Sequence, residues 1–167
     1  MSNLVYFAHG KESGPWGDKI QHLAAIAKAC GFEVESPDYS FTKNQEERVE
    51  MLLALNPQAD NLILVGSSMG GYVSAVASDQ LKPDGLFLMA PAFYVPFYNE
   101  QNPKPYASKT IIVHGENDEI IPVSHSKKYA DEYDVELHVL NSDHRLKSAI
   151  TDIGELFKDF LNTFVMV

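Results

Sequence analysis

The chain has 167 residues, of which 23 are acidic and 13 basic, and its formal net charge is −10. This length supports one buried core but is short for two domains, so we expect a single domain over residues 1–167. The acidic balance argues against a nucleic-acid or anionic-membrane partner. The sequence has one cysteine, no apolar run of membrane length and no basic leader, which predicts a cytoplasmic protein.

Short apolar runs alternate with longer segments of helical period, a pattern typical of βαβ units. Strands are predicted at residues 4–8, 33–36, 62–65, 85–89, 110–113 and 135–140. Helices are predicted near residues 17–30, 43–55, 69–80, 124–132 and 145–163. The alternation predicts an α/β fold: a three-layer sandwich whose open, mostly parallel sheet of about six strands carries helices on both faces. Ligands bind at the carboxyl ends of the strands in such sheets, so functional residues should follow strands directly.

The most informative motif is Gly66-Ser67-Ser68-Met69-Gly70, which follows the apolar run 61–65 and leads directly into a helical segment. A serine at the tip of a sharp strand-to-helix turn has a strained backbone, and glycine two residues away on either side avoids a collision. Ser68 is therefore the candidate nucleophile. The alternative, a glycine-rich turn without chemistry, is disfavoured by the strand before the motif and the helix after it.

A serine hydroxyl needs a base, and the base needs a carboxylate to fix its tautomer. Asp118 follows the strand 110–113 after a short turn, and His144 follows the last strand, 135–140. Glu116 and Glu119 flank Asp118 and could act as the acid on chemistry alone. Asp143 adjoins His144 and is better placed to cap the following helix. The pattern predicts a nucleophile, an acid and a base in that order along the chain.

The chain resembles the α/β-hydrolase fold in this order of residues and in four motifs. The motifs are the elbow at 66–70, the Gly-x-x-Asp-x-x-x-Pro stretch at 115–122, Asp143-His144, and His9-Gly10 after the first strand. It is similar in particular to small, lidless bacterial serine hydrolases of the carboxylesterase type. The resemblance covers nearly the whole chain. It implies that Asp118 is the acid, and that the first two strands of larger members are missing, which leaves six strands and a shallow, open site.

Two backbone donors are expected to hold the developing oxyanion. The residue after the nucleophile, Met69, supplies one N–H at a helix start. The resemblance implies that the second comes from the loop after the first strand, which makes the backbone of Lys11 the candidate. His9 is expected to support this loop, and Gly10 to lie beside the substrate.

The irregular segment 91–106 is rich in aromatic residues and proline, and we interpret it as a wall of the substrate pocket that includes Phe93 and Phe97. Trp16 is a second wall candidate. In both places, packing on the domain surface without substrate contact remains an open alternative.

These residues together predict a serine hydrolase that cleaves a small carboxylic ester or thioester through an acyl-enzyme. Acyl transfer and peptide cleavage on the same residues remain alternatives, as does a catalytically idle binding protein. We expect no metal and no organic cofactor, because there is neither a ligand cluster nor a phosphate-binding glycine loop. The expected partner is a small-molecule ester, with no nucleic acid or membrane, and the protein is expected to be a monomer or a homodimer.

Overall fold

The computed structural model describes residues 2–165, and in it six strands form one open sheet in the order β2-β1-β3-β4-β5-β6. All five neighbouring pairs are parallel. The strands are β1 (Asn3–Ala8), β2 (Glu33–Glu35), β3 (Asn61–Ser67), β4 (Gly85–Met89), β5 (Lys109–Gly115) and β6 (Glu136–Leu140). The helices are α1 (Asp18–Ala29), α2 (Gln45–Leu55), α3 (Met69–Leu81), α4 (Val123–Tyr133) and α5 (Ile150–Val165), with a short 3₁₀ turn at Lys147–Ala149. The predicted α/β class and strand number are confirmed.

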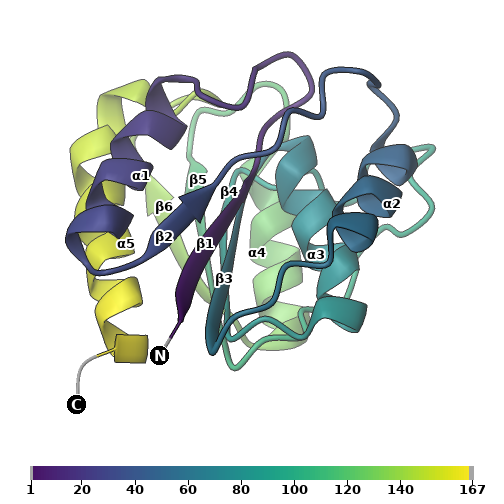
Figure 1. Cartoon of the computed structure of the whole chain (residues 1–167). Helices are drawn as coiled ribbons and strands as arrows, with labels where there is room; N and C mark the ends of the chain where they lie inside the picture. The colour runs from purple at the N-terminus through teal and green to yellow at the C-terminus, as the bar shows by residue number, and fades with distance from the viewer. Residues whose placement is uncertain (1, 166–167) are drawn as a thin grey trace.

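Helices cover both faces of the sheet and form two separate apolar cores. Figure 1 shows α1 and α5 on one face and α2, α3 and α4 on the other. Across the sheet, Phe7 pairs in register with Val65, Val65 with Phe87 and Phe87 with Ile111, and all four side chains lie in the core beneath α1 and α5. Side chains alternate between the two faces of a strand, so the residues next to this row form a second row on the opposite face, beneath α2, α3 and α4.

The pattern of burial along each strand follows its place in the sheet. All five residues of β4 are buried, because β4 has a neighbour on each side and helices on both faces. The edge strands β2 and β6 instead carry exposed glutamates at positions 33, 35 and 136. Charged residues at an edge discourage pairing with another chain.

The last helix begins later than its sequence predicts. The helical pattern predicted a start near residue 145, whereas α5 begins at Ile150. Asp143 Oδ1 accepts hydrogen bonds from the backbone N–H groups of Arg145 (3.1 Å) and Leu146 (3.2 Å), which forms a turn, and Leu146 is left-handed with φ of 62°. A left-handed residue breaks the helical ladder, so the segment before Ile150 is a turn and a 3₁₀ helix. None of the helices within residues 2–165 is long and apolar enough to cross a membrane.

The carboxyl ends of the parallel strands lie together at the upper edge of the sheet in Figure 1. The loops after β1, β3, β5 and β6 therefore meet at this edge. It is the edge at which open α/β sheets bind ligands.

Candidate active site

Ser68 stands at the tip of the turn between β3 and α3, in a conformation that non-glycine residues rarely adopt. Its φ is 54° and its ψ is −115°. Two backbone hydrogen bonds hold it there: Ser68 N–H donates to the Met89 carbonyl (2.9 Å), and Ala92 N–H donates to the Ser68 carbonyl (2.9 Å). Strain of this kind persists only where the surroundings enforce it, and the predicted elbow is confirmed.

The two glycines of the elbow are required by close approach, since neither has a positive φ. A Cβ on Gly70 would overlap the Ala8 carbonyl at the end of β1, and a Cβ on Gly66 would overlap the Gly70 carbonyl. Backbone atoms of the turn thus pack directly against one another and against the end of β1, which fixes the position of Ser68 at the edge of the sheet.

His144 lies between Ser68 and Asp118 and contacts both. Its Nδ1 is 2.6 Å from Asp118 Oδ2, and its Nε2 is 3.1 Å from Ser68 Oγ. The carboxylate only accepts, so Nδ1 carries the proton and the Nε2 lone pair faces the serine hydroxyl. Three residues separated by 50 and 26 positions in sequence thus form one hydrogen-bonded chain.

The Asp118 carboxylate is shielded from solvent and held from several sides. Its side chain has no exposed surface. Oδ1 accepts the backbone N–H groups of Ile120 and Ile121, each at 2.8 Å, and this leaves Oδ2 for His144. These donors hold the carboxylate in one orientation.

The competing acidic residues do not contact His144. Glu116 and Glu119 are exposed, and the Asp143 carboxylate is occupied by the N–H groups of the turn that follows it. Geometry therefore selects Asp118 from the four candidates.

A second histidine, His114, lies behind the carboxylate, and sequence reasoning missed it. Its ring is fully buried, with Nε2 2.8 Å from the Ile121 carbonyl and 3.1 Å from Asp118 Oδ2, and Nδ1 2.7 Å from Ser126 Oγ. Since a carbonyl only accepts, Nε2 carries the proton, and Ser126 donates to Nδ1. Burial lowers the pKa of His114, so the ring is a neutral donor facing the carboxylate. The available signal was a histidine directly after the apolar run 111–113 of β5.

The loops that carry Asp118 and His144 are joined through their backbones. Glu116 N–H donates to the Leu140 carbonyl (2.8 Å) and Asn117 N–H to the Ser142 carbonyl (3.0 Å). At Gly115, a Cβ would overlap the carbonyl oxygens of both Ser142 and the following residue. Asp118 and His144 are therefore presented by two loops in direct backbone contact.

The predicted oxyanion donors lie in the same cleft as Ser68. Met69 is the first residue of α3, and Lys11 follows β1 in the loop beside Gly10. Neither backbone N–H donates to any other group within residues 2–165. Gly10 approaches Ser68 closely: a Cβ on Gly10 would be 3.8 Å from the Ser68 Cβ. Both N–H groups are thus available to a ligand at the serine.

The cleft above Ser68 has a volume of about 1130 Å³ and two unlike walls. Apolar and aromatic residues from the segment after β4 and the loop after β5 form one wall: Ala92, Val95, Tyr98, Ile120 and Ile121. Backbone and charged groups from the loop after β1, the start of α1 and the loop after β6 form the other, including Lys11, Lys19 and Arg145.

The structure corrects three of the predicted pocket residues. Phe93 has no exposed surface, because its ring stacks on Tyr129 at 4.1 Å beneath the segment 91–106. Phe97 is 96% exposed and points away from the cleft, since a positive φ of 78° turns the chain outward there. Trp16 is 46% exposed and does not line the cleft, although Gly14, Gly17 and Asp18 near it in the chain do. The segment does border the cleft, but through Val95 and Tyr98.

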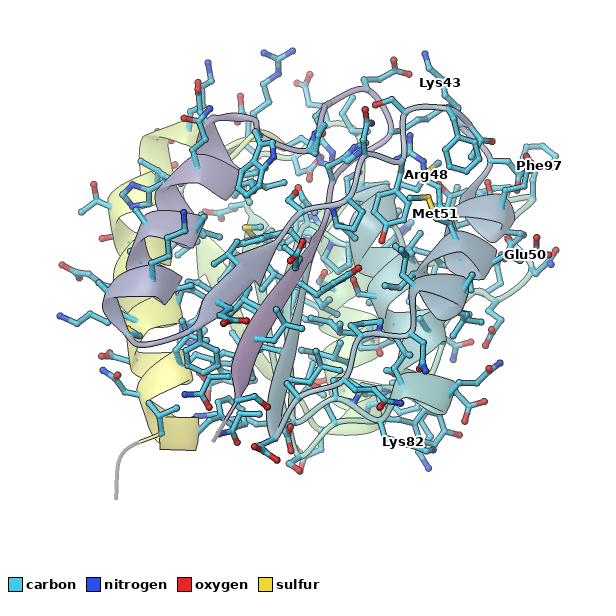
Figure 2. The ribbon with its side chains drawn as sticks, viewed as in Figure 1. Lys43, Arg48, Glu50, Met51, Lys82 and Phe97 are labelled. Atoms are coloured by element: carbon cyan, nitrogen blue, oxygen red, sulfur yellow. The ribbon has the colours of Figure 1, made fainter. Side chains whose placement is uncertain are left out.

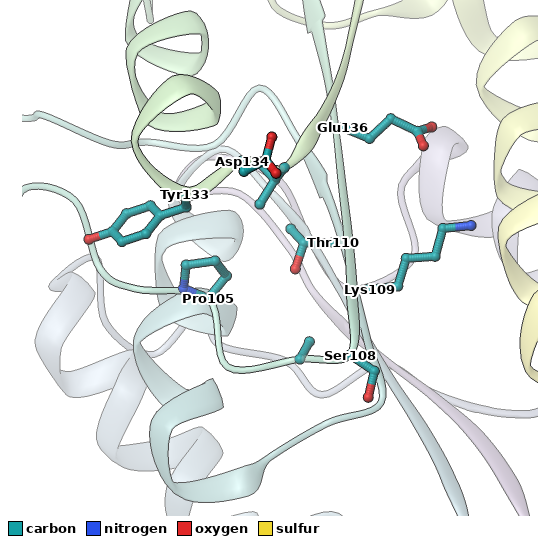
Figure 3. A pocket seen from close by; sticks show the side chains of 9 residues that line it. Pro105, Ser108, Lys109, Thr110, Tyr133, Asp134 and Glu136 are labelled. Carbon is teal, nitrogen blue, oxygen red and sulfur yellow. The ribbon is translucent and has the colours of Figure 1, made fainter.

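A smaller hollow of about 330 Å³ lies at the opposite end of the sheet, around the amino-terminal ends of β5 and β6 (Figure 3). The nine residues that line it include Ser108 and Thr110 but no histidine. A hydroxyl without a base is a poor nucleophile, so this hollow offers no counterpart to Ser68. Across the described chain, no group of three or more His, Cys, Asp or Glu residues is placed to hold a metal ion.

No family model matches the chain, and no curated protein sequence matches it. Several solved structures are similar to the chain. A protein from Xanthomonas campestris pv. campestris assigned to the α/β superfamily of hydrolases is 27% identical, with a TM-score of 0.88 over 96% of this chain and 99% of that one. XC6422 from Xanthomonas campestris, an α/β serine hydrolase without a lid, is 19% identical, with a TM-score of 0.72 over 98% and 83% of the two chains. Est1E from Butyrivibrio proteoclasticus is 15% identical, with a TM-score of 0.76 over 96% and 87%.

These likenesses extend over whole chains, so the relation does not rest on one shared motif. The strand order, the elbow after β3 and the chain order of the three hydrogen-bonded residues agree with the same family. The chain therefore has the α/β-hydrolase fold, and it is similar in fold to small hydrolases of this superfamily, one of which is described as having no lid.

Proposed function

We propose that the protein is a serine hydrolase that cleaves a small carboxylic ester or thioester through an acyl-enzyme, with Ser68 as nucleophile, His144 as base and Asp118 as acid. The observation that carries this proposal is the continuous chain from Ser68 Oγ to His144 (3.1 Å) and from His144 to Asp118 (2.6 Å) beside an open cleft. Nucleophile, base and orienting carboxylate within hydrogen-bond reach form the arrangement that acyl transfer requires.

In the first step, Ser68 Oγ attacks the carbonyl carbon while His144 Nε2 takes the hydroxyl proton. Asp118 stabilises the resulting imidazolium, and the N–H groups of Met69 and Lys11 hold the negative oxygen. His144 then gives the proton to the departing alcohol or thiol, which leaves the acyl group on Ser68. Water, deprotonated by His144, attacks the acyl-enzyme in the second half, and the acid is released as Ser68 regains its proton.

The lining of the cleft beside Ser68 supports an apolar acyl or alcohol group. The apolar wall with Val95, Tyr98 and Ile120 can hold a short hydrocarbon or aromatic group beside the serine. One of the similar solved structures, Est1E, holds bound ferulic acid, which is an aromatic carboxylic acid. A carboxylic acid is also the product expected from the proposed reaction.

The proposal is tested by intact mass spectrometry after treatment with a fluorophosphonate, together with turnover of p-nitrophenyl acetate. We expect one adduct and measurable hydrolysis in the wild type, and neither in Ser68→Ala. Ser74→Ala is the matched control, because Ser74 lies in the following helix and its buried hydroxyl has no partner within residues 2–165. Wild-type protein that forms no adduct and turns over no ester would contradict the proposal and favour the idle binding protein.

A further inference from the structure

Arg48 on α2 is a buried cation with no acidic partner. The residue is 1% exposed, and no carboxylate oxygen within residues 2–165 lies within 4.0 Å of its guanidinium. Figure 2 shows it on the side of α2 that faces the sheet, whereas Lys43 and Phe97 extend outward nearby. Burial of an unpaired charge costs several kcal/mol unless hydrogen bonds replace its hydration, so the groups that Arg48 contacts need an explanation.

All of the hydrogen bonds from Arg48 go to backbone carbonyls, and most go to one loop. Nη1 donates to the carbonyls of Gly10 (3.0 Å) and His9 (3.4 Å), and Nη2 donates to that of Lys11 (3.3 Å). Nε donates to the Thr42 carbonyl at 2.9 Å. The guanidinium thus binds three successive carbonyls of the loop after β1, which is the loop that borders Ser68.

The Gly10 carbonyl receives further donors. The Tyr39 N–H donates to His9 Nε2 (2.9 Å), so Nδ1 of this ring carries the proton and donates to the Gly10 carbonyl at 2.8 Å. Ser13 Oγ lies 3.4 Å from the same oxygen. Burial lowers the pKa of His9, which keeps its ring neutral and Nε2 free to accept. One carbonyl therefore accepts from a charged donor and from two neutral ones.

The direction of this carbonyl sets the direction of the Lys11 N–H. Both groups belong to the Gly10–Lys11 peptide, and in a planar trans peptide the C=O and the following N–H point in opposite directions. With its oxygen held against Arg48 and His9, the peptide turns its N–H away from them. Hydrogen bonds to a carbonyl also polarise the amide and strengthen its N–H as a donor.

We propose that Arg48 is a positioning residue for the oxyanion site: it fixes and polarises the Gly10–Lys11 peptide so that the Lys11 N–H is a stronger donor to the substrate oxyanion. This inference rests on the proposed function, in which Lys11 supplies that donor. Arg48 does not contact substrate; it acts only through the backbone of the loop.

The test compares an ester with the thionoester of the same acid and alcohol. The sulfur of a thionoester is a weak hydrogen-bond acceptor, so its reaction depends less on the oxyanion donors. Arg48→Met should lower kcat for the ester by about 10- to 100-fold with little change in KM, since loss of a whole donor costs about 10²- to 10³-fold. The ratio of ester to thionoester turnover should fall in parallel, while the pH midpoint of kcat/KM stays the same. A purely structural role would slow both substrates equally.

Tyr72→Phe is the matched control, because it removes the hydrogen bonds of the Tyr72 hydroxyl to Glu46 of α2 (2.9 Å) and from the Glu100 N–H (3.2 Å), neither of which belongs to the loop after β1. Its ester to thionoester ratio should equal that of the wild type. Arg48→Lys keeps a cation but not the fork of donors, and should give an intermediate ratio if Arg48→Met does not fold. An unchanged ratio in a folded Arg48 variant overturns the proposal.

Two NMR measurements separate this proposal from the proposed function. In the free protein, Arg48→Met or Arg48→Lys should move the Lys11 amide proton upfield and leave that of Met69 in place, whether or not the protein hydrolyses esters. In the wild type, a boronic acid that adds to Ser68 should move both amide protons downfield. A Lys11 resonance that stays fixed while that of Met69 moves would overturn the role of Arg48 without any variant. Absence of Ser68-dependent turnover, by contrast, would contradict the proposed function alone.

Discussion

Asp118→Asn should abolish most of the turnover by reversing one tautomer, and the structure shows which way the new amide would turn. Oδ1 of Asp118 accepts two backbone N–H groups at 2.8 Å, so the oxygen of the substituted amide must occupy that place. The opposite orientation would set an NH₂ group against two donors and cost roughly 1–3 kcal/mol for each unpaired group. The NH₂ group therefore faces His144 Nδ1 in place of Oδ2.

A donor at that position requires His144 to accept through Nδ1 and carry its proton on Nε2. In this tautomer the ring cannot take the proton from Ser68, whose Oγ is 3.1 Å from Nε2. Loss of the correct tautomer in a serine triad lowers kcat by about 10⁴-fold, or about 5.4 kcal/mol of transition-state stabilisation. The NH₂ group would also face His114 Nε2–H, which is 3.1 Å from Oδ2. The fold should survive, because the amide oxygen keeps both backbone hydrogen bonds and His114 keeps its 2.8 Å hydrogen bond to the Ile121 carbonyl.

The assay is hydrolysis of p-nitrophenyl acetate, with the rate of fluorophosphonate labelling as a second reading of Ser68 reactivity. Glu116→Gln, Glu119→Gln and Asp143→Asn serve as controls, and each should lose much less activity, because none of these carboxylates contacts His144. An Asp118→Asn enzyme within about tenfold of wild type would refute the tautomer argument. If Asp143→Asn were the most damaging of the four, the acid would have to be reassigned.

Three further outcomes follow from packing and burial. Phe93→Ala should lower the free energy of unfolding by about 3–5 kcal/mol in denaturant titrations and reduce the turnover of every ester alike. Phe97→Ala should change neither stability nor turnover. A change in ester preference in either variant would instead support a pocket role for these rings. Gly70→Ala should be destabilised by at least about 1–3 kcal/mol, because its Cβ would displace the end of β1, and a wild-type melting temperature would disprove this. Burial lowers the pKa of both His9 and His114 in the folded protein. The unfolded chain, whose histidine pKa is about 6.5, therefore binds more protons than the folded protein below that pH. The free energy of unfolding should fall between pH 7 and 5 by up to about 2.7 kcal/mol per pH unit. Melting curves of His114→Asn should show a shallower dependence, and an unchanged slope would count against the burial of that ring as its origin.

The strand-turn-helix elements around Ser68 were predictable because their signals are local. The apolar run of β3, the glycines at 66 and 70 and the helical pattern of α3 are contiguous in sequence, and the structure reproduces them. The order of Ser68, Asp118 and His144 was predictable for a related reason: each follows a strand, and parallel topology brings strand ends together.

The pocket wall and the supporting residues were not predictable in this way. An aromatic residue in an irregular segment can face the cleft, the core or solvent, and Phe93 and Phe97 take the last two because of one stacking contact and one positive φ. His114 contacts Asp118 and Ser126, which are near it in sequence, but only the fold of the turn between them brings the side chains together. Arg48 on α2 contacts Gly10, 38 residues away, and no spacing rule connects the two. Such contacts depend on tertiary packing.

The contact at Gly115 has a consequence for how this scaffold can be altered. The loop that carries Asp118 and the loop that carries His144 meet there without a side chain between them. An insertion in either loop would therefore displace both Asp118 and His144. The segment 91–106 is held at Ala92, whose N–H donates to the Ser68 carbonyl, but its residues after Ala92 form no hydrogen bond with Ser68, Asp118 or His144, and they border the cleft through Val95 and Tyr98. Selection for new substrates should therefore accumulate substitutions and length changes in that segment, while 115–122 and 141–146 keep their lengths.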